Sequence, residues 1–305
     1  MEETQAQDAP IQEIYTSPLR RMPPVPFIIL SLSLVFFTYQ IVGGIATFLM
    51  FGITVNEENV QLVRWSTLIG QVLLILVPTI LLARARHGDY KVFLGINTPD
   101  IKLAVLACIG VFALQQVLQG YMLFQDSLPL PSDVQDFVDK IKGLFEEMYK
   151  LLITARSPAE FAFVVLVVAL TPAVCEEVFF RGLIQRNLET VSTGFRAAVI
   201  SGVIFGLYHL NPFSFVALAV LGMYFGFLVY RSNNLTIAIV AHFFNNFIAC
   251  LALYLHLEDD FIAISPGGEP TSGQLFANYA LFGLVFLVAT YYFIRGTTPT
   301  VSAEG

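Results

Sequence analysis

The chain has 305 residues, of which 56% are hydrophobic and 13% charged, and its mean hydropathy is +0.72. This is far more apolar than a soluble globular domain, and apolar runs of about 20 residues recur along the whole length, which excludes a soluble protein with one membrane anchor. The net charge of −7 comes from the polar ends and one acidic loop, and no basic tract indicates a nucleic-acid partner.

A polar segment, 1–25, precedes eight apolar runs, each of which predicts a membrane-spanning helix. The first run is too long for a signal peptide and has no small-residue cleavage site, so we interpret it as a helix. The eight runs are Pro26–Gly52, Ser66–Ala85, Ile101–Phe124, Ala159–Phe180, Phe195–Leu210, Phe213–Tyr230, Leu235–Leu257 and Leu275–Ile294. We therefore predict an all-α fold, a single polytopic bundle of about eight transmembrane helices over 26–295, with a short tail at 296–305.

Two glycine pairs in the C-terminal half of the chain have the GxxxG spacing. Gly202 pairs with Gly206, and Gly222 pairs with Gly226. Small residues four apart lie on one helical face and let two helices approach closely in a membrane. We expect tight helix packing there.

The segment 132–155, between the third and fourth runs, has a different pattern. Its apolar residues recur every three or four positions among Asp, Glu and Lys, which predicts an amphipathic helix lying on the membrane surface. A lid over the bundle and a simple connector are both compatible with this pattern. The apolar positions are Val134, Phe137, Val138, Ile141, Leu144, Phe145, Met148 and Leu152.

Basic residues in the loops indicate the orientation, because cytoplasmic loops of membrane proteins carry more Lys and Arg. With a cytoplasmic N-terminus, eleven basic residues fall inside and five outside, so we predict that both termini are cytoplasmic. The small size of the chain suggests a bacterial cell membrane. The inside set is Arg20, Arg21, Arg84, Arg86, Lys91, Lys102, Arg181, Arg186, Arg196, Arg231 and Arg295, and the outside set is Arg64, Lys140, Lys142, Lys150 and Arg156.

Ionisable residues at membrane depth are costly, so each one is a candidate functional residue. The fourth run ends with Glu176, Glu177 and Arg181. Glu177 and Arg181 are four apart and predict an ion pair on one helical face, whereas Glu176 points about 100° away and is free to react. Pro172 removes a helical hydrogen bond nearby and indicates a place where the helix can kink. The alternative is a charge cluster that only marks the end of the helix.

Two histidines also lie within apolar runs. His209 ends a Phe-x-x-x-His pattern that begins at Phe205, and His242 begins a His-x-x-x-Asn pattern that ends at Asn246. His242 and Asn246 share a helical face. A single buried histidine is most often a core residue. Two histidines and a carboxylate within the membrane each need a polar partner, and pairing with one another satisfies all three at the lowest free-energy cost.

The ordered set Glu-Glu-x-x-x-Arg, Phe-x-x-x-His and His-x-x-x-Asn on successive apolar runs resembles the CAAX protease and bacteriocin-processing family of intramembrane peptidases, which includes the type II CAAX prenyl endopeptidases. The resemblance covers 159 to about 255. It implies an eight-helix bundle with a cavity open toward the cytoplasm and functional roles for Glu176, Glu177, Arg181, His209, His242 and Asn246.

Two mechanisms are open for such a peptidase. In the first, Glu176 and His209 activate a water, His242 and Asn246 stabilise the oxyanion, and Glu177 with Arg181 holds the helix end. In the second, Glu176, His209 and His242 bind zinc, whose bound water becomes the nucleophile. We favour the first, because a ligand histidine usually donates its second N–H to a carboxylate or carbonyl and Arg181 is expected to occupy Glu177.

One geometric difficulty remains for both mechanisms. If the fourth helix ended near Arg181, Glu176 would lie at its cytoplasmic end, about 20 Å from His209 along the bundle. The two can meet only if the fourth helix continues past Arg181 to Leu188.

The expected partners are the lipid bilayer and a peptide or protein substrate, with no nucleic acid. In a bacterium, a leader peptide or membrane-tethered peptide fits better than a prenylated CAAX protein. A non-enzymatic scaffold or self-immunity protein of the same fold is the main alternative. A transporter is disfavoured because no inverted repeat is visible.

Overall fold

A computed structural model of the chain describes residues 17–52, 55–257 and 272–297. Of the predicted tails 1–25 and 296–305, residues 1–16 and 298–305 lie outside the described residues, whereas the helix Pro18–Arg21 and the start of the helix Pro24–Phe36 lie within the first tail. The described part contains helices and no strands, which confirms the predicted all-α bundle. The elements are α1 (Pro18–Arg21), α2 (Pro24–Phe36), η1 (Phe37–Gly43), α3 (Gly44–Phe51), α4 (Val60–Gln71), η2 (Val72–Leu76), α5 (Val77–Arg86), α6 (Tyr90–Leu94), α7 (Ile101–Asp126), α8 (Ser132–Ile153), α9 (Pro158–Val164), η3 (Val165–Leu170), α10 (Thr171–Glu177), η4 (Val178–Gln185), α11 (Arg186–Glu189), α12 (Gly194–Tyr208), α13 (Phe215–Ser232), α14 (Leu235–Tyr254) and α16 (Ser272–Arg295), where η marks a π-helical stretch.

Among the described residues, seven helices are long and apolar enough to cross a membrane. The predicted span Phe195–Leu210 is the exception: α12 has 15 residues and is about 22 Å long, shorter than a hydrocarbon core of roughly 30 Å. Leu210 turns the chain with a φ of +51°, and because the turn is itself apolar, hydropathy does not reveal it. The seven spans are Pro24–Phe51, Val60–Arg86, Ile101–Asp126, Pro158–Glu189, Phe215–Ser232, Leu235–Tyr254 and Gly273–Arg295.

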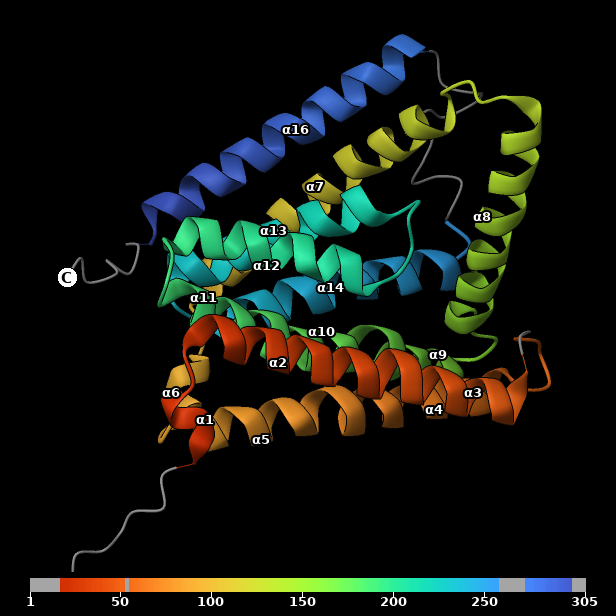
Figure 1. Cartoon of the computed structure of the whole chain (residues 1–305). Helices are drawn as coiled ribbons and strands as arrows, with labels where there is room; N and C mark the ends of the chain where they lie inside the picture. Colours follow the sequence, from red (N-terminus) through yellow and green to blue (C-terminus); the bar gives the residue numbers. More distant parts are fainter. Residues whose placement is uncertain (1–16, 53–54, 258–271, 298–305) are drawn as a thin grey trace, which may run out of the picture.

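The long helices run back and forth between two ends of the bundle (Figure 1). Helices α1, α6 and α11 and the last turn of α16 lie at one end, while α3 and α8 lie at the other. Arg86 ties α5 to the carbonyls of Leu19 and Met22, and Arg231 ties α13 to the carbonyl of Ile294. Both described chain ends therefore lie at the same end of the bundle.

The fourth span is a continuous helical segment of 32 residues, Pro158–Glu189, made of α9, η3, α10, η4 and α11. The predicted end at Phe180 is wrong. The helix continues because Arg181 and Gln185 are buried and bonded to neighbouring backbone, so they behave as interior residues. The fourth helix thus continues past Arg181 to Leu188, which is the condition for Glu176 and His209 to lie at a similar depth in the bundle.

Helices α12 and α13 form a close antiparallel pair that the glycine spacing predicted. A Cβ atom on Gly202 would lie 2.3 Å from the backbone N of Met223, and one on Gly222 would lie 2.9 Å from the carbonyl oxygen of Gly202. Only hydrogen fits at these positions. The backbone of α13 is thereby brought next to α12 and η4.

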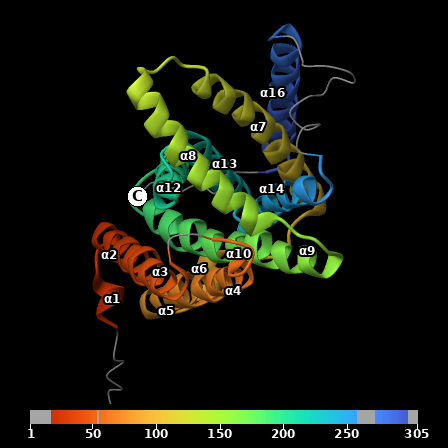
Figure 2. The same cartoon turned by 90° about the vertical axis from the view of Figure 1, so that its right-hand side faces the viewer.

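The predicted amphipathic helix is present as α8, which lies across one end of the bundle rather than along it (Figures 1 and 2). Its C-terminal end is held by Arg64 of α4, which is 1% exposed and donates to the carbonyls of Leu151, Leu152 and Thr154. Arg64 also pairs with Glu160 at 2.7 Å.

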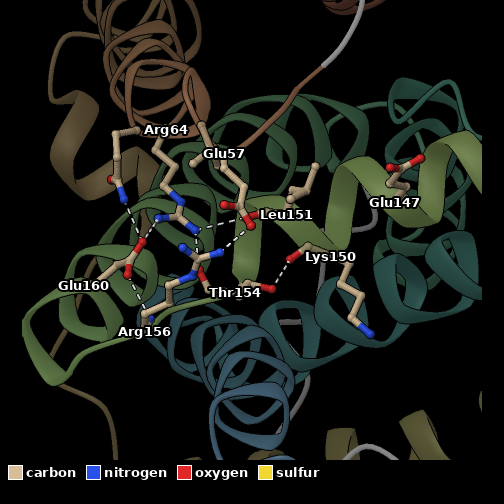
Figure 3. Close-up of a pocket in the computed structure, with 10 residues that line it drawn as sticks. Glu57, Arg64, Glu147, Lys150, Leu151, Thr154, Arg156 and Glu160 are labelled. Carbon is tan, nitrogen blue, oxygen red and sulfur yellow. Dashed lines mark hydrogen bonds and ion pairs between the residues drawn. The ribbon is translucent and has the colours of Figure 1, made fainter.

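Beside this anchor is a pocket of about 500 Å³ (Figure 3). The acidic and basic side chains of its wall balance one another in number. None of the residues singled out as a candidate functional residue from the sequence lies in its lining, which is Glu57, Val60, Gln61, Arg64, Glu147, Lys150, Leu151, Thr154, Arg156 and Glu160.

Candidate active site

Glu177 is the centre of a buried polar cluster. It is 0% exposed, and its Oε1 accepts hydrogen bonds from Arg181 Nη1 and from His242 Nδ1, both at 2.9 Å. The ion pair with Arg181 confirms the prediction from the i, i+4 spacing. The bond to His242 was not predicted, and it joins the first sequence motif to the third across the packing of α10 against α14.

Arg181 is also 0% exposed, and the fold compensates its charge from several sides. Besides the Glu177 carboxylate, its Nη2 donates to the carbonyl of Gly222 at 2.7 Å, and the guanidinium lies 4.6 Å from the centre of the Phe205 ring. The carbonyl is within reach because Gly222 has no side chain between α13 and its neighbours. These interactions offset the desolvation of a charge buried at membrane depth.

His242 is 5% exposed and is held between two aromatic rings. Phe225 stacks on it with ring centres 4.9 Å apart and planes at 12°, and Phe205 contacts it edge-on at 5.9 Å. With Nδ1 bonded to Glu177, the ring orientation is fixed and Nε2 is left for another partner. Phe225 was missed by the sequence reasoning, because an apolar residue in an apolar span gives no signal of its role.

His209 follows the last residue of α12 and is exposed at the turn to α13. Its Nδ1 lies 2.8 Å from the carbonyl oxygen of Phe205, and its ring contacts the Phe205 ring at 4.7 Å. Phe205 therefore contacts both histidines and Arg181. The Phe-x-x-x-His pattern has a physical basis, since one ring links the second motif to the other two.

The depths of Glu176 and His209 also agree. Glu176 lies 13 residues before the end of its helix at Glu189, and His209 lies 15 residues after the start of α12 at Gly194. A short connection joins these two helix ends, so at 1.5 Å per residue both side chains are about 20 Å from the same end of the bundle. The continued fourth helix therefore places the two residues at a similar depth, although no contact joins their side chains within the described residues.

Glu176 is half-buried and has no hydrogen bond within the described part of the chain. It interacts electrostatically with Arg181 and with Tyr39 of η1. Its carboxylate is therefore unengaged, in contrast to that of Glu177, as the 100° difference in direction predicted.

Asn246 connects α14 to the backbone next to Pro172. Its Nδ2 donates to the carbonyl of Val168 at 3.2 Å, and its Oδ1 accepts from Asn245 at 3.2 Å. Pro172 has no N–H to give to the carbonyl four residues earlier, which is that of Val168. The Asn246 side chain of the third motif thus supplies to the Val168 carbonyl the donor that Pro172 lacks. The second amide hydrogen of Asn246 is available to another acceptor.

Comparison with protein families was made on the sequence. Residues 158–248 match the family described as type II CAAX prenyl endopeptidase Rce1-like. This stretch, the Rce1-like segment, is similar to that family. The match confirms the resemblance predicted from the three motifs, and the Rce1-like segment, which runs from α9 into α14, contains every candidate site residue. No curated protein matches the chain.

The Rce1-like segment contains the three ligands of the zinc hypothesis, Glu176, His209 and His242. Both histidines have Nδ1 engaged by an oxygen and Nε2 available, as metal-binding histidines do. The argument that Arg181 would keep Glu177 from His242 is therefore wrong, since one Glu177 oxygen serves both. However, within the described residues no group of three His, Cys, Asp or Glu side chains is arranged to hold a metal ion, so the proposed ligand set does not fit zinc in this geometry.

Proposed function

We propose that the protein is an intramembrane endopeptidase that hydrolyses a peptide bond in a membrane-associated or leader-type peptide. The observation that carries this proposal is the buried Glu177, whose bonds to Arg181 and His242 join two of the three motifs while Glu176 beside it is unengaged. A charged cluster at membrane depth is costly and needs a functional reason. The Rce1-like match over 158–248 supports a protease family.

Hydrolysis begins with activation of a water molecule. Glu176 accepts a proton from the water, and His209, whose Nδ1 donates to the Phe205 carbonyl, presents Nε2 as an acceptor that orients the same water. The water oxygen attacks the carbonyl carbon of the scissile bond. Glu176 then passes the proton to the leaving amine, and the C–N bond breaks.

Negative charge develops on the carbonyl oxygen during this attack. His242, with a proton on each ring nitrogen, donates Nδ1–H to Glu177 and presents Nε2–H to the oxyanion. The Glu177 carboxylate accepts from this ring and from Arg181, and these two bonds hold the imidazole in place. The free amide hydrogen of Asn246 is the second donor. Glu177 and Arg181 act by positioning and not by contact with the substrate.

The proposal predicts that Glu176→Gln removes cleavage without removing the protein. Membranes from cells with the wild-type protein and with Glu176→Gln would be compared by quantitative proteomics. Full-length precursors should accumulate with Glu176→Gln, and their cleaved forms should disappear. Glu146→Gln, the same chemical change on the exposed surface of α8, is the matched control. Identical peptide profiles for Glu176→Gln and wild type would favour a scaffold or self-immunity protein of the same fold.

A further inference from the structure

The first helical hairpin lies outside the Rce1-like segment, yet it reaches the proposed site. Gln40, in the π-helical stretch η1, is half-buried and donates from Nε2 to the carbonyl of Tyr208 at 2.5 Å. Tyr208 is the last residue of α12 and directly precedes His209. In a membrane, a polar side chain is satisfied by a hydrogen bond to a neighbouring helix, so this bond joins η1 to the end of α12.

The end of α12 shows what this bond contributes. The last four carbonyls of a helix have no donor within the helix, and in an apolar setting each must be satisfied otherwise. His209 satisfies two of them, since its Nδ1 bonds the carbonyl of Phe205 and its backbone N–H bonds that of Gly206. Leu210 N–H bonds the carbonyl of Leu207. The fourth, that of Tyr208, is bonded by Gln40 of another helix.

The Tyr208 side chain is fixed from the same direction. Its hydroxyl donates to the carbonyl of Leu32, and its ring packs edge-on against Phe36, with 5.6 Å between ring centres. On its other side the ring contacts Phe180 of η4 at 5.2 Å. The residue before His209 is therefore clamped between α2 and the helix that carries Glu176.

The residue next to Gln40 reaches the other half of the proposed water-activating pair. Tyr39 interacts electrostatically with Glu176 and with the side chain of Gln71. In an α-helix, adjacent residues diverge by about 100°. Both residues lie in the π-helical stretch η1, where Tyr39 interacts with Glu176 and Gln40 bonds the residue before His209, and such π-helical turns recur at functional sites.

We infer that Gln40 is a positioning residue for His209, so that the α2–η1 helix, outside the family-matched segment, is part of the hydrolytic apparatus. The inference rests on the proposed function. Gln40 contacts no reacting atom in this view. It fixes the backbone of Tyr208, and through it the imidazole of His209, at the depth of Glu176.

Gln40→Met tests this, because methionine matches the length of glutamine but cannot donate. Thr38→Val is the control: Thr38 lies on the same η1 stretch, and its hydroxyl donates to the carbonyl of Leu74 of η2 at 3.1 Å, away from α12. The chain has four histidines, so 15N-histidine labelling in detergent micelles gives few imidazole signals, and His209→Gln assigns the relevant one.

Gln40→Met should shift or broaden the His209 signal, while the His87 signal stays in place. It should lower kcat on a substrate peptide by about tenfold to a hundredfold with KM changed less than twofold, since a misplacement of about 1 Å costs up to roughly a hundredfold. Thr38→Val should change neither. An unchanged His209 signal in Gln40→Met would overturn the inference. A kcat of Gln40→Met equal to that of the wild type would also overturn it, provided that Glu176→Gln is inactive in the same assay. Wild-type activity of Glu176→Gln would instead overturn the proposed function.

Discussion

Two adjacent carboxylates in this protein have opposite surroundings. Glu177 is enclosed and accepts two hydrogen bonds, whereas Glu176 is half-buried and accepts none within the described residues. The difference follows from the helix, on which neighbouring side chains point in different directions. At the scale of single residues, one carboxylate holds two motifs together, and the other accepts no hydrogen bond, as the proposed proton transfer requires.

Glu177→Ala and Arg181→Ala are each expected to destabilise the protein by about 3–5 kcal/mol, because each leaves a buried charge without its partner. Folded protein in the membrane and the melting temperature in detergent would be measured. Glu176→Gln is the control and should leave both unchanged. If Glu176→Gln destabilises the protein while Glu177→Ala is silent, the two carboxylates have been assigned in the wrong order.

His242→Gln is expected to lower the cleavage rate by about 10²–10³-fold without abolishing it, since an amide can still donate to the oxyanion. Bound metal would be measured for both proteins alongside activity before and after exhaustive chelation, and activity should survive chelation. Activity that disappears on chelation and returns with stoichiometric zinc, together with loss of metal in His242→Gln, would establish the zinc mechanism.

The pairs that could be predicted from the sequence are those within one helix. The bond between Glu177 and Arg181 follows from their spacing, because the helix fixes the distance. The bond between Glu177 and His242 spans 65 residues and depends on how α10 packs against α14. The spacing assigns Glu177 to Arg181 alone, so the sequence did not predict this bond. Gln40 and Phe225 carry no pattern in the sequence and could not be predicted.

At the scale of elements, hydropathy located the spans but not all of their ends. The apolar run of the fourth helix ends at Phe180, before a charged residue, although the fold buries Arg181 completely. The fifth span was extended through Leu210 because the turn is apolar. A sequence window measures polarity and not burial, so it misplaces helix ends where buried charge or an apolar turn occurs.

The contact between α12 and α13 gives a test at this scale. Gly202→Ala places a methyl group 2.3 Å from the backbone of Met223, so the helices must separate, at an expected cost of about 1–3 kcal/mol. Cleavage should also fall, because Gly222, which bonds Arg181, moves with α13. Gly283→Ala in α16, with nothing within 4 Å of the added atom, is the control. Equal melting temperatures for the two variants would show that the close contact does not exist.

At the scale of the whole molecule, α1 and the last turn of α16 lie at the same end of the bundle and α8 lies across the other (Figure 1). Arg20, Arg86, Arg231 and Arg295 belong to the first of these ends, and the excess of basic residues predicts that this end is cytoplasmic. Apolar side chains of α8, such as Phe137, are exposed and available to lipid on the opposite side.

Reporter fusions after Arg20 and after Arg295 are therefore both expected to report the cytoplasm. A cysteine introduced at Lys140, an exposed charged position of α8, should react with a membrane-impermeant thiol reagent from outside, with Lys91 of α6 as the protected control position. An outside signal from either fusion would contradict this orientation.

The central claim is that Glu176 activates the water that cleaves a membrane peptide. Purified wild-type and Glu176→Gln protein would be reconstituted in liposomes with a tethered peptide that proteomics identified as a substrate, and the initial cleavage rates would be compared at equal amounts of folded protein. Loss of a general base predicts a rate lower by about 10²–10⁴-fold in Glu176→Gln. Cleavage at the wild-type rate by folded Glu176→Gln would contradict the account.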